Sequence, residues 1–416
     1  MNMAPPQTRR DLTVGPSRRR SWLSPRSAVV ALATLVVAVP VTQVTLSLLQ
    51  TAGRPDMAVK LWPYNSLALA RLAGDAAIPG QSAASIGRAR ANARRALMLE
   101  PGNVIAARAI GIIAGLNGDG PGMARALTYS ETLSRRDRPT QLGLIEMSVQ
   151  KQDIAGALRH YNRALRTSQS VPFLLSIMIA ASSDPEILSG VVKLLRDRPT
   201  WRSAFLVQMV DEQTAPDIVL GYLRALRLNP ADTFERQILS RAVGKLVGQD
   251  RVADVTALLP KTPGLIRNGG FENENIFPPL DWALVDDANL NGVIEAAPTG
   301  PGQVLYAEAH NGRGGKVAEE VTSLSQGKYR ITFIAGDVTS GALPKITLNC
   351  GNDDNRVLAS LTPPVTGPSK KAAVSQIFSV GPNCRVQRVK VLMQGTIEGD
   401  TPRPWIDNVA IVPEQS

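Results

Sequence analysis

A stretch of 22 residues without a charged side chain, from Ala28 to Leu49, constrains this chain more than any other feature. Arg26 and Arg54 bound it. As an α-helix the stretch is about 33 Å long, which is enough to cross a hydrocarbon core of about 30 Å. Its second half is the more polar one, because Thr, Gln and Ser follow Pro40. The stretch predicts a transmembrane helix over residues 28–49.

Two other interpretations of the apolar stretch stay open, a cleaved secretory signal and a buried core helix. A signal needs a small-x-small cleavage site after its apolar core, and residues 40–43, PVTQ, offer none. The leader, residues 1–27, carries six Arg and one Asp, and its composition predicts a disordered tail. The positive-inside bias then predicts a single-pass protein of the bacterial inner membrane, with a cytoplasmic N-terminus and a periplasmic bulk.

The chain has two cysteines, Cys350 and Cys384, and both lie on the side predicted to be exported. An oxidising compartment allows them to pair, and the closed loop stabilises the fold by about 3 to 4 kcal/mol in a chain-entropy model. We expect a disulfide between them. Two separate buried thiols are the alternative.

The net charge of +11 is spread unevenly along the chain. The leader carries +5, residues 54–264 carry +9, and residues 265–416 carry −3. A nucleic-acid-binding protein concentrates basic residues on a folded domain with base-reading partners, and this pattern is missing, so we expect no nucleic-acid partner. Only two histidines are present, His160 and His310, so the chain has almost no residues from which to build a histidine zinc site or a Ser/His/Asp catalytic triad.

Residues 54–260 are rich in Ala, Leu and Arg, and a short phrase nearly repeats, RALMLEPG at 95–102 and RALRLNPA at 224–231. Small residues at the spacing i, i+4, i+7 let antiparallel helices approach closely, and a Pro about five residues later ends the second helix. The pattern recurs with a period close to 34 residues. Its members are Ala89, Ala93, Ala96, Pro101, Ala157, Tyr161, Ala164, Tyr222, Ala225 and Pro230.

On these residues the segment resembles the tetratricopeptide-repeat family, whose helix-turn-helix units stack into a superhelix. The match is degenerate, since Thr128 and Glu131 stand where the family prefers an aromatic residue and an Ala. The resemblance implies an α-solenoid of four to six repeats that offers a concave face to a protein partner. The basic surface favours an anionic partner or is simply solvated. We expect His160 to be exposed or to line the groove.

Beyond residues 261–264, alternation with a period of two replaces helical periodicity. Tyr329, Ile331 and Phe333 alternate with polar residues, and residues 346–350 behave in the same way. Such segments between Gly, Pro and Asn turns predict half-buried antiparallel strands, and about eight of them predict a β-sandwich or jelly roll over residues 265–416.

The two ends of this region resemble the opening and closing strands of galactose-binding-like jelly rolls, the fold of many carbohydrate-binding modules. The resemblance is carried by residues 265–272, by Leu280-Asp281-Trp282 and by residues 405–411. It implies that Glu272 and Asp407 help to hold a structural Ca²⁺, a cation that prefers hard oxygen ligands. Two carboxylates satisfied by strand-end amides are the alternative.

Glycan binding by the sandwich needs exposed aromatic or polar side chains. The candidates are Trp282, His310, Asn311 and Arg313. For Trp282 the alternative is packing in the core, and for residues 309–315 it is a plain surface turn.

Repeats joined to a jelly roll behind one N-terminal span resemble membrane-anchored periplasmic proteins of bacterial exopolysaccharide or capsule systems. The resemblance implies a non-enzymatic scaffold whose repeats contact a protein of the cell envelope and whose sandwich binds polysaccharide or packs on the repeats. The alternatives are a glycan-processing enzyme and a general envelope-assembly protein without a glycan role. Catalysis needs two carboxylates about 5 to 9.5 Å apart. Asp286-Asp287 and Asp353-Asp354 are the nearest pairs, but adjacent acids on a strand point to opposite faces.

Overall fold

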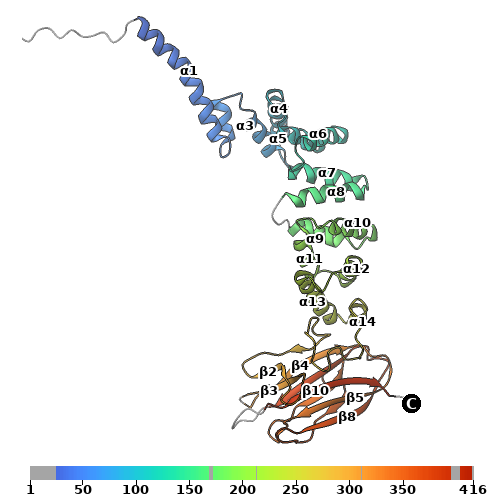
Figure 1. The fold of residues 1–416 in the computed structure, drawn as a ribbon. Coiled ribbons are helices and arrows are strands. Elements are labelled where there is room, and N and C mark those ends of the chain that lie inside the picture. Colours follow the sequence, from blue (N-terminus) through green and yellow to red (C-terminus); the bar gives the residue numbers. More distant parts are fainter. Residues whose placement is uncertain (1–24, 168–171, 212, 311, 395–402, 415–416) are drawn as a thin grey trace, which may run out of the picture. The chain divides into compact units, whose positions relative to one another are not determined.

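The structure of the chain is a computed structural model that describes residues 25–167, 172–211, 213–310, 312–394 and 403–414. Its internal contacts divide the chain into two compact units, residues 1–153 and 154–416. The first unit is helical, and the second holds the remaining helices and both sheets (Figure 1). The last helix ends at Thr256 and the first strand begins at Ala283, whereas the compact units divide earlier, after Asp153.

Helix α1, Pro25–Gln50, contains the apolar stretch. Within the described ranges, residues 28–50 form the one helix that is long and apolar enough to cross a membrane. All side chains from Val29 to Val37 are exposed, on every face of the helix. From Pro40 onward one side is covered, because Pro40, Val44 and Ser47 follow one another at helical spacing and are less exposed than their neighbours.

The rest of the first unit consists of short helices joined by tight connections. Side-chain caps begin most of them; Asn65, for example, accepts a hydrogen bond from the backbone amide of Ala68. The helices are α2 (Pro55–Leu61), α3 (Ser66–Ala76), α4 (Ala83–Leu99), α5 (Val104–Leu116), α6 (Gly120–Leu133) and α7 (Arg138–Gln150).

The second unit begins with helices whose core contains larger side chains. Trp201, Phe205 and Tyr222 pack edge to face. One close contact recurs along the chain: Leu158 packs against Gly190, and one helix pair later Leu188 packs against Gly221. The helices are α8 (Ile154–Arg166), α9 (Pro172–Ala181), α10 (Pro185–Arg196), α11 (Arg202–Met209), α12 (Pro216–Leu226), α13 (Thr233–Gly248) and α14 (Val252–Thr256).

The small residues of the repeat pattern lie mostly inside the helix pairs. Those that the structure buries are Ala89, Ala93, Ala96, Ala157, Ala164 and Tyr222, while Tyr161, Ala225 and Pro230 are partly buried and Pro101 is exposed. The expectation of an exposed or groove-lining His160 is wrong. His160 lies three residues after Ala157 and four before Ala164, which places it on the buried face of α8.

The strands form two five-stranded antiparallel sheets that pack face to face as a β-sandwich. The sheet orders are β1-β4-β9-β6-β7 and β2-β3-β10-β5-β8. The strands are β1 (Ala283–Leu284), β2 (Leu290–Ala296), β3 (Gln303–Ala309), β4 (Gly314–Thr322), β5 (Gly327–Gly336), β6 (Lys345–Cys350), β7 (Val357–Leu361), β8 (Lys371–Val380), β9 (Gln387–Gln394) and β10 (Trp405–Pro413).

The sandwich and the helices of the second unit share one apolar core. Phe277, Leu280 and Val321 belong to the same cluster as the buried side chains of α8–α14. Val321 lies on the outer face of the sheet β1-β4-β9-β6-β7, so the helices cover part of that face. This shared core explains why residues 154–416 form a single compact unit.

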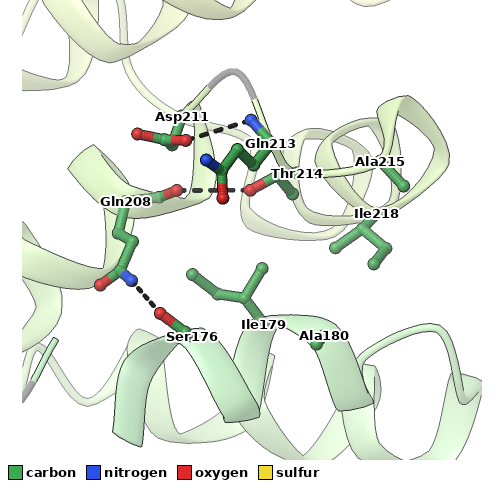
Figure 2. Close-up of a pocket in the computed structure, with 9 residues that line it drawn as sticks. All are labelled: Ser176, Ile179, Ala180, Gln208, Asp211, Gln213, Thr214, Ala215 and Ile218. Carbon is green, nitrogen blue, oxygen red and sulfur yellow. Dashed lines mark hydrogen bonds between the residues drawn. The ribbon is translucent and has the colours of Figure 1, made fainter. Parts of the chain in front are cut away.

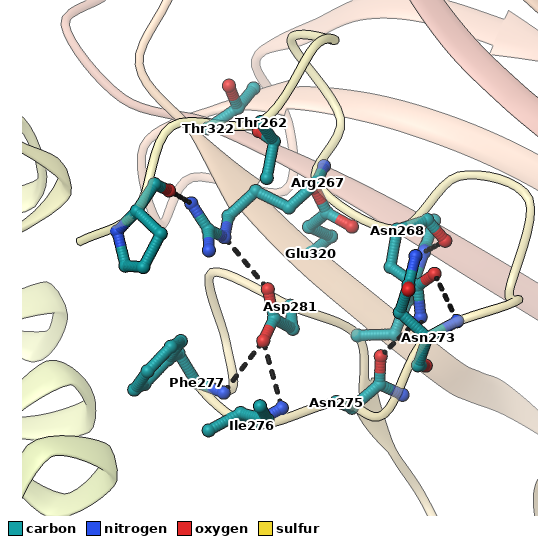
Figure 3. A network of polar contacts seen from close by, with 12 residues as sticks. Thr262, Arg267, Asn268, Asn273, Asn275, Ile276, Phe277, Asp281, Glu320 and Thr322 are labelled. Carbon is teal, nitrogen blue, oxygen red and sulfur yellow. Dashed lines mark hydrogen bonds and ion pairs between the residues drawn. The ribbon is translucent and has the colours of Figure 1, made fainter. Parts of the chain in front are cut away.

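A buried polar network fixes the chain where it enters the sandwich (Figure 3). The Arg267 guanidinium pairs with Asp281 at 2.8 Å and donates to the Pro260 carbonyl oxygen. The second Asp281 oxygen accepts from the backbone amides of Ile276 and Phe277. Beside them the fully buried Glu320 accepts from the Arg267 backbone amide, and burial raises the pKa of Glu320 to about 8.

Candidate functional site

The outer face of the sheet β2-β3-β10-β5-β8 carries a row of side chains that runs across all five strands. Strand register places Val293, Tyr306, Trp405, Gly336 and Lys371 directly beside one another. The neighbours of these residues along each strand, such as Leu305 and Ile406, point to the opposite side, into the sandwich core. Two large aromatic rings therefore lie side by side on the outer face of the sheet, and both are largely covered by their neighbours, with Tyr306 8% and Trp405 6% exposed.

The Trp405 ring occupies space that a side chain at position 336 would fill, because residue 336 is a glycine. A Cβ atom at Gly336 would come within 2.2 Å of that ring. The Trp405 indole donates a hydrogen bond to the Asp337 carboxylate at 3.0 Å. Tyr306 and Trp405 pack with Val304 in a small apolar cluster that is separate from the sandwich core.

Arg403 covers the Tyr306 ring and is held between two carboxylates. Its guanidinium carbon lies 4.4 Å from the ring centroid, which is a cation–π distance. The guanidinium donates to Glu295 at 2.9 Å and also to Glu308. Partial burial opposes the charge on Arg403, but these hydrogen bonds outweigh it and raise the pKa of Arg403. Burial also raises the pKa of the Tyr306 phenol.

Polar atoms of this group remain open to solvent. The side chains of Arg403 and Glu295 are 46% and 48% exposed. His310, one of the residues predicted to bind glycan, joins the group, because its Nε2 atom lies 3.8 Å from a Glu308 oxygen. We call Glu295, Tyr306, Glu308, Arg403 and Trp405 the outer-face site.

The other predicted glycan-binding residues have different positions. Trp282 is 1% exposed and packs against Phe271 in the core, so the prediction that it binds glycan is wrong. Its indole donates to the Asn268 carbonyl oxygen, which satisfies its only polar atom. Arg313 is exposed in the turn that leads into β4, and Asn311 lies outside the described residues.

Glu272 and Asp407, predicted to help hold Ca²⁺, lie near one another at the beginning of β3. Burial raises the pKa of the Asp407 carboxyl, and the charge of Glu272 adds to this shift. Glu272 accepts from the Gln303 amide at 3.0 Å, and Asp407 accepts from the Asn408 amide at 2.6 Å. Across the described ranges, no group of three or more His, Cys, Asp or Glu could hold a metal ion.

The disulfide between Cys350 and Cys384 is present, as predicted. It joins the end of β6 to the turn before β9, with the two Cα atoms 5.5 Å apart. Both cysteines are buried.

The acids considered for catalysis serve turns and ion pairs. Asp287 accepts from the backbone amides of Asn289 and Leu290, which lowers its pKa, and Asp353 accepts from the Asn355 amide. A hydrogen bond from Lys390 lowers the pKa of Asp354. The backbone of Asp286 forms an isolated antiparallel β-bridge with the backbone of Asn291.

The helical part of the second unit contains an open pocket of about 480 Å³ between α9, α11 and α12 (Figure 2). Gln208 reaches across it from α11 to Ser176 on α9, and Ile179 and Ile218 form its apolar wall. Phe173, one turn before Ser176 on α9, is 72% exposed.

Comparisons with known proteins leave the family open. No protein-family model matches the sequence, and no curated protein is similar to it. Among solved structures, a family 61 carbohydrate-binding module bound to β-1,4-galactotriose is 15% identical, with a TM-score of 0.28 over 37% of this chain and 100% of the module. A putative sugar-binding protein from Bacteroides thetaiotaomicron is 12% identical, with a TM-score of 0.30 over 36% of this chain and 100% of its own.

A cyclase from Fischerella sp. TAU is also similar, with 17% identity and a TM-score of 0.28 over 37% of this chain and 98% of the cyclase. Similarities at this level leave the function to be argued from the residues of this chain.

Proposed function

We propose that this protein is a single-span, membrane-anchored scaffold of the bacterial cell envelope that binds a glycan through its sandwich. Its N-terminus is cytoplasmic and its bulk is periplasmic. Its helices form tetratricopeptide-like repeats that hold a protein component of an exopolysaccharide or capsule system. The protein binds and does not catalyse.

The outer-face site is the observation that carries this proposal. Sugar hydroxyls are recognised by planar charged groups that make paired hydrogen bonds, next to an apolar surface. Arg403 and Glu295 supply such groups with about half of each side chain in solvent, and the Tyr306 ring, which is 8% exposed, supports the guanidinium from beneath. The pairs with Glu295 and Glu308 fix the guanidinium before any ligand arrives, which lowers the cost of ordering it on binding.

The same geometry argues for binding over catalysis. A glycosidase needs one carboxylic acid that donates a proton to the leaving group. Glu295 and Glu308 both accept hydrogen bonds from Arg403, so neither is set up as a donor. Asp287 and Asp353 are committed to turns.

A buried polar network supports an anchor that is not cleaved. Ser47, near the end of α1, donates to the Ala58 carbonyl oxygen in α2, and Asn65 donates to both Ser47 and Thr51, each at 2.8 Å. Cleavage of a signal within the apolar stretch after Val39 would strip residues from the helix that carries this network. Ser47 and Thr51 would stay on the chain, but on a helix shortened to its last few turns, and such short helices are marginal in water.

Exposed apolar side chains support a protein partner for the helices. Phe173 and Ile177 lie one turn apart on α9, and Val207 on α11 is also exposed. The same two helices contribute Ser176 and Gln208 to the pocket of Figure 2, whose polar wall also includes Asp211. A peptide segment with an apolar anchor and a polar backbone suits this surface.

Calcium at Glu272 and Asp407 remains part of the proposal. Two neighbouring carboxylates supply hard oxygen ligands, but Ca²⁺ takes six to eight, so backbone carbonyls and waters would complete the set. Burial is the main cause of the raised Asp407 pKa, and bound Ca²⁺ would neutralise the repulsion from Glu272 that adds to it. We expect Ca²⁺, and not Mg²⁺, to raise the melting temperature of the wild type and not of an Asp407→Asn variant; equal melting temperatures with and without Ca²⁺ would exclude the site.

The proposed function is tested by presenting the full-length chain, purified in detergent, to an array of bacterial polysaccharide fragments. We expect retention of at least one glycan. Retention of none, together with normal surface polysaccharide in a deletion strain, would favour the envelope protein without a glycan role. Release of reducing ends from a retained glycan would favour the enzyme.

A further inference from the structure

The segment that follows α1 exposes aromatic, apolar and basic side chains together. Tyr64 is 61% exposed, and Met57 and Leu67 are exposed beside it. Trp62 is partly buried and meets the edge of the Tyr64 ring at 5.6 Å. We call residues 55–67, which comprise α2 and the start of α3, the membrane-side hairpin.

This hairpin lies beside the end of α1. Figure 1 shows the chain turning back after α1. Ser47 contacts Ala58, so the residues after Ala58 lie beside the turns of α1 that precede Ser47. The covered positions of those turns, Pro40 and Val44, agree with this placement. The chain then turns again, because Asn65 donates to both Ser47 and Thr51, so its neighbour Tyr64 lies at the level of the last turn of α1.

The hairpin matches the chemistry of a bilayer surface. The charge-free stretch of α1 ends at Leu49, and its length of about 33 Å puts the level where hydrocarbon ends near the last turn of the helix. Trp and Tyr are enriched at that level, where their rings meet the headgroups. Basic side chains surround them: Lys60 is exposed, and the Arg95 guanidinium lies 5.8 Å from the Tyr64 ring centroid.

We propose that the membrane-side hairpin lies on the outer surface of the bilayer, with Met57 and Tyr64 among the headgroups and Lys60 and Arg95 toward anionic phosphates. This inference rests on the proposed anchoring by α1. Arg54 adds a third cation, against two exposed carboxylates, those of Asp56 and of Glu100, which accepts from the Ser66 hydroxyl. Anionic headgroups complement this excess, because each Lys or Arg near such a surface adds attraction.

The test places one fluorescent thiol probe at a time in the full-length chain. The positions are Val36 in the apolar half of α1, Tyr64 in the hairpin and Ile78, each changed to Cys. The native cysteines are paired and do not react. Ile78 is the matched control, because it is also apolar and exposed but follows the far end of α3, about 16 Å from Tyr64 along that helix.

Each labelled variant is reconstituted into vesicles of brominated phosphatidylcholine and phosphatidylglycerol, in which contact with lipid quenches the probe. We expect strong quenching at residue 36, clear quenching at 64 and none at 78. Quenching at 36 with none at 64 would overturn the hairpin proposal and leave the anchor intact. An unquenched probe at 36 would overturn both.

A second position and a second lipid complete the test. A probe at Met57→Cys should be quenched like the one at residue 64. If neither probe is quenched, damage caused by replacing Tyr64 alone cannot be the reason, and the proposal is overturned. In vesicles of phosphatidylcholine alone, we expect quenching at 64 to fall about two-fold, with no change at 36. Equal quenching in both lipids would contradict the role of Lys60 and Arg95.

Discussion

Each of the two sheets carries a group of three ion-paired side chains on its outer face, and the central charge of the two groups has the opposite sign. On the sheet β1-β4-β9-β6-β7, the Glu319 carboxylate lies between Lys316 and Arg388. On the sheet β2-β3-β10-β5-β8, the Arg403 guanidinium lies between Glu295 and Glu308. The first group has one excess positive charge and the second has one excess negative charge.

The difference between the faces lies in what surrounds these groups. Val321 on the first face packs into the core of the helices, so that face serves partly as an internal interface. On the second face, Tyr306 and Trp405 lie beneath and beside the ions, and their apolar cluster contains only residues between 297 and 405. Similar strand geometry thus supports an internal interface on one face and, on the other, the partly solvent-exposed ions of the outer-face site.

The largest expected effect concerns Glu320, which lies on β4 and points into the sandwich. Glu320 is protonated in the folded protein up to a pH of about 8, whereas in the unfolded chain it ionises near its ordinary value of 4.5. Its contribution to stability is therefore fully present below pH 4.5 and is lost as the pH rises through about 8. We expect the free energy of unfolding to fall by up to about 1.4 kcal/mol per pH unit in this window.

Urea unfolding at a series of pH values measures this slope, and a Glu320→Gln variant should lack most of it. A wild-type stability that stays constant or rises between pH 5 and pH 8, after comparison with this variant, would contradict the assignment. The Gln side chain keeps the oxygen that accepts from the Arg267 amide, so the variant is expected to fold.

A smaller effect is expected at Gly336, which gives Trp405 its place. A Gly336→Ala change forces the Cβ atom into the Trp405 ring, so we expect a loss of about 1 to 3 kcal/mol of stability and weaker glycan binding. The matched control is Gly381→Ala, whose Cβ atom would meet nothing within 4 Å. Thermal unfolding of both variants measures this loss. Equal melting temperatures would mean that the Trp405 ring moves aside without a loss of stability.

The smallest effect is expected at Glu319. Burial opposes the charge of its carboxylate, but Lys316 and Arg388 outweigh burial and lower its pKa. Its stabilisation is therefore present above pH 4.5 and is lost as the pH falls through the lowered value, which is the opposite direction to Glu320. We expect Glu319→Gln to cost about 0.5 to 1 kcal/mol at pH 7 and less at pH 3. A cost that grows on acidification would be inconsistent with this account.

Local patterns in the sequence predicted the elements of this fold, whereas the site depended on topology. Apolar length predicted α1, and alternation of apolar and polar residues predicted the strands. Glu295 and Arg403 are separated by 108 residues. They meet because β10 inserts between β3 and β5, and no pattern within one segment reports such an insertion.

The two aromatic positions show the same limit. Trp282 was the leading candidate for glycan contact but lies in the core, while Tyr306 and Trp405 lie on the outer face. Alternation along β3 does separate Tyr306 from Leu305 and Ala307. It leaves undecided which of the two sets is the inner one, because both are apolar.

Glycan binding by the outer-face site is tested most directly by two matched variants. The dissociation constant of the glycan retained by the full-length chain is measured by calorimetry for the wild type, Arg403→Ala and Lys316→Ala, whose residues belong to the ion-pair groups of the two outer faces. Hydrogen bonds to a charged group contribute about 1.5 to 3 kcal/mol, so we expect Arg403→Ala to weaken binding by about 10- to 100-fold and Lys316→Ala by less than about two-fold. Unchanged binding by the Arg403→Ala variant would contradict the account.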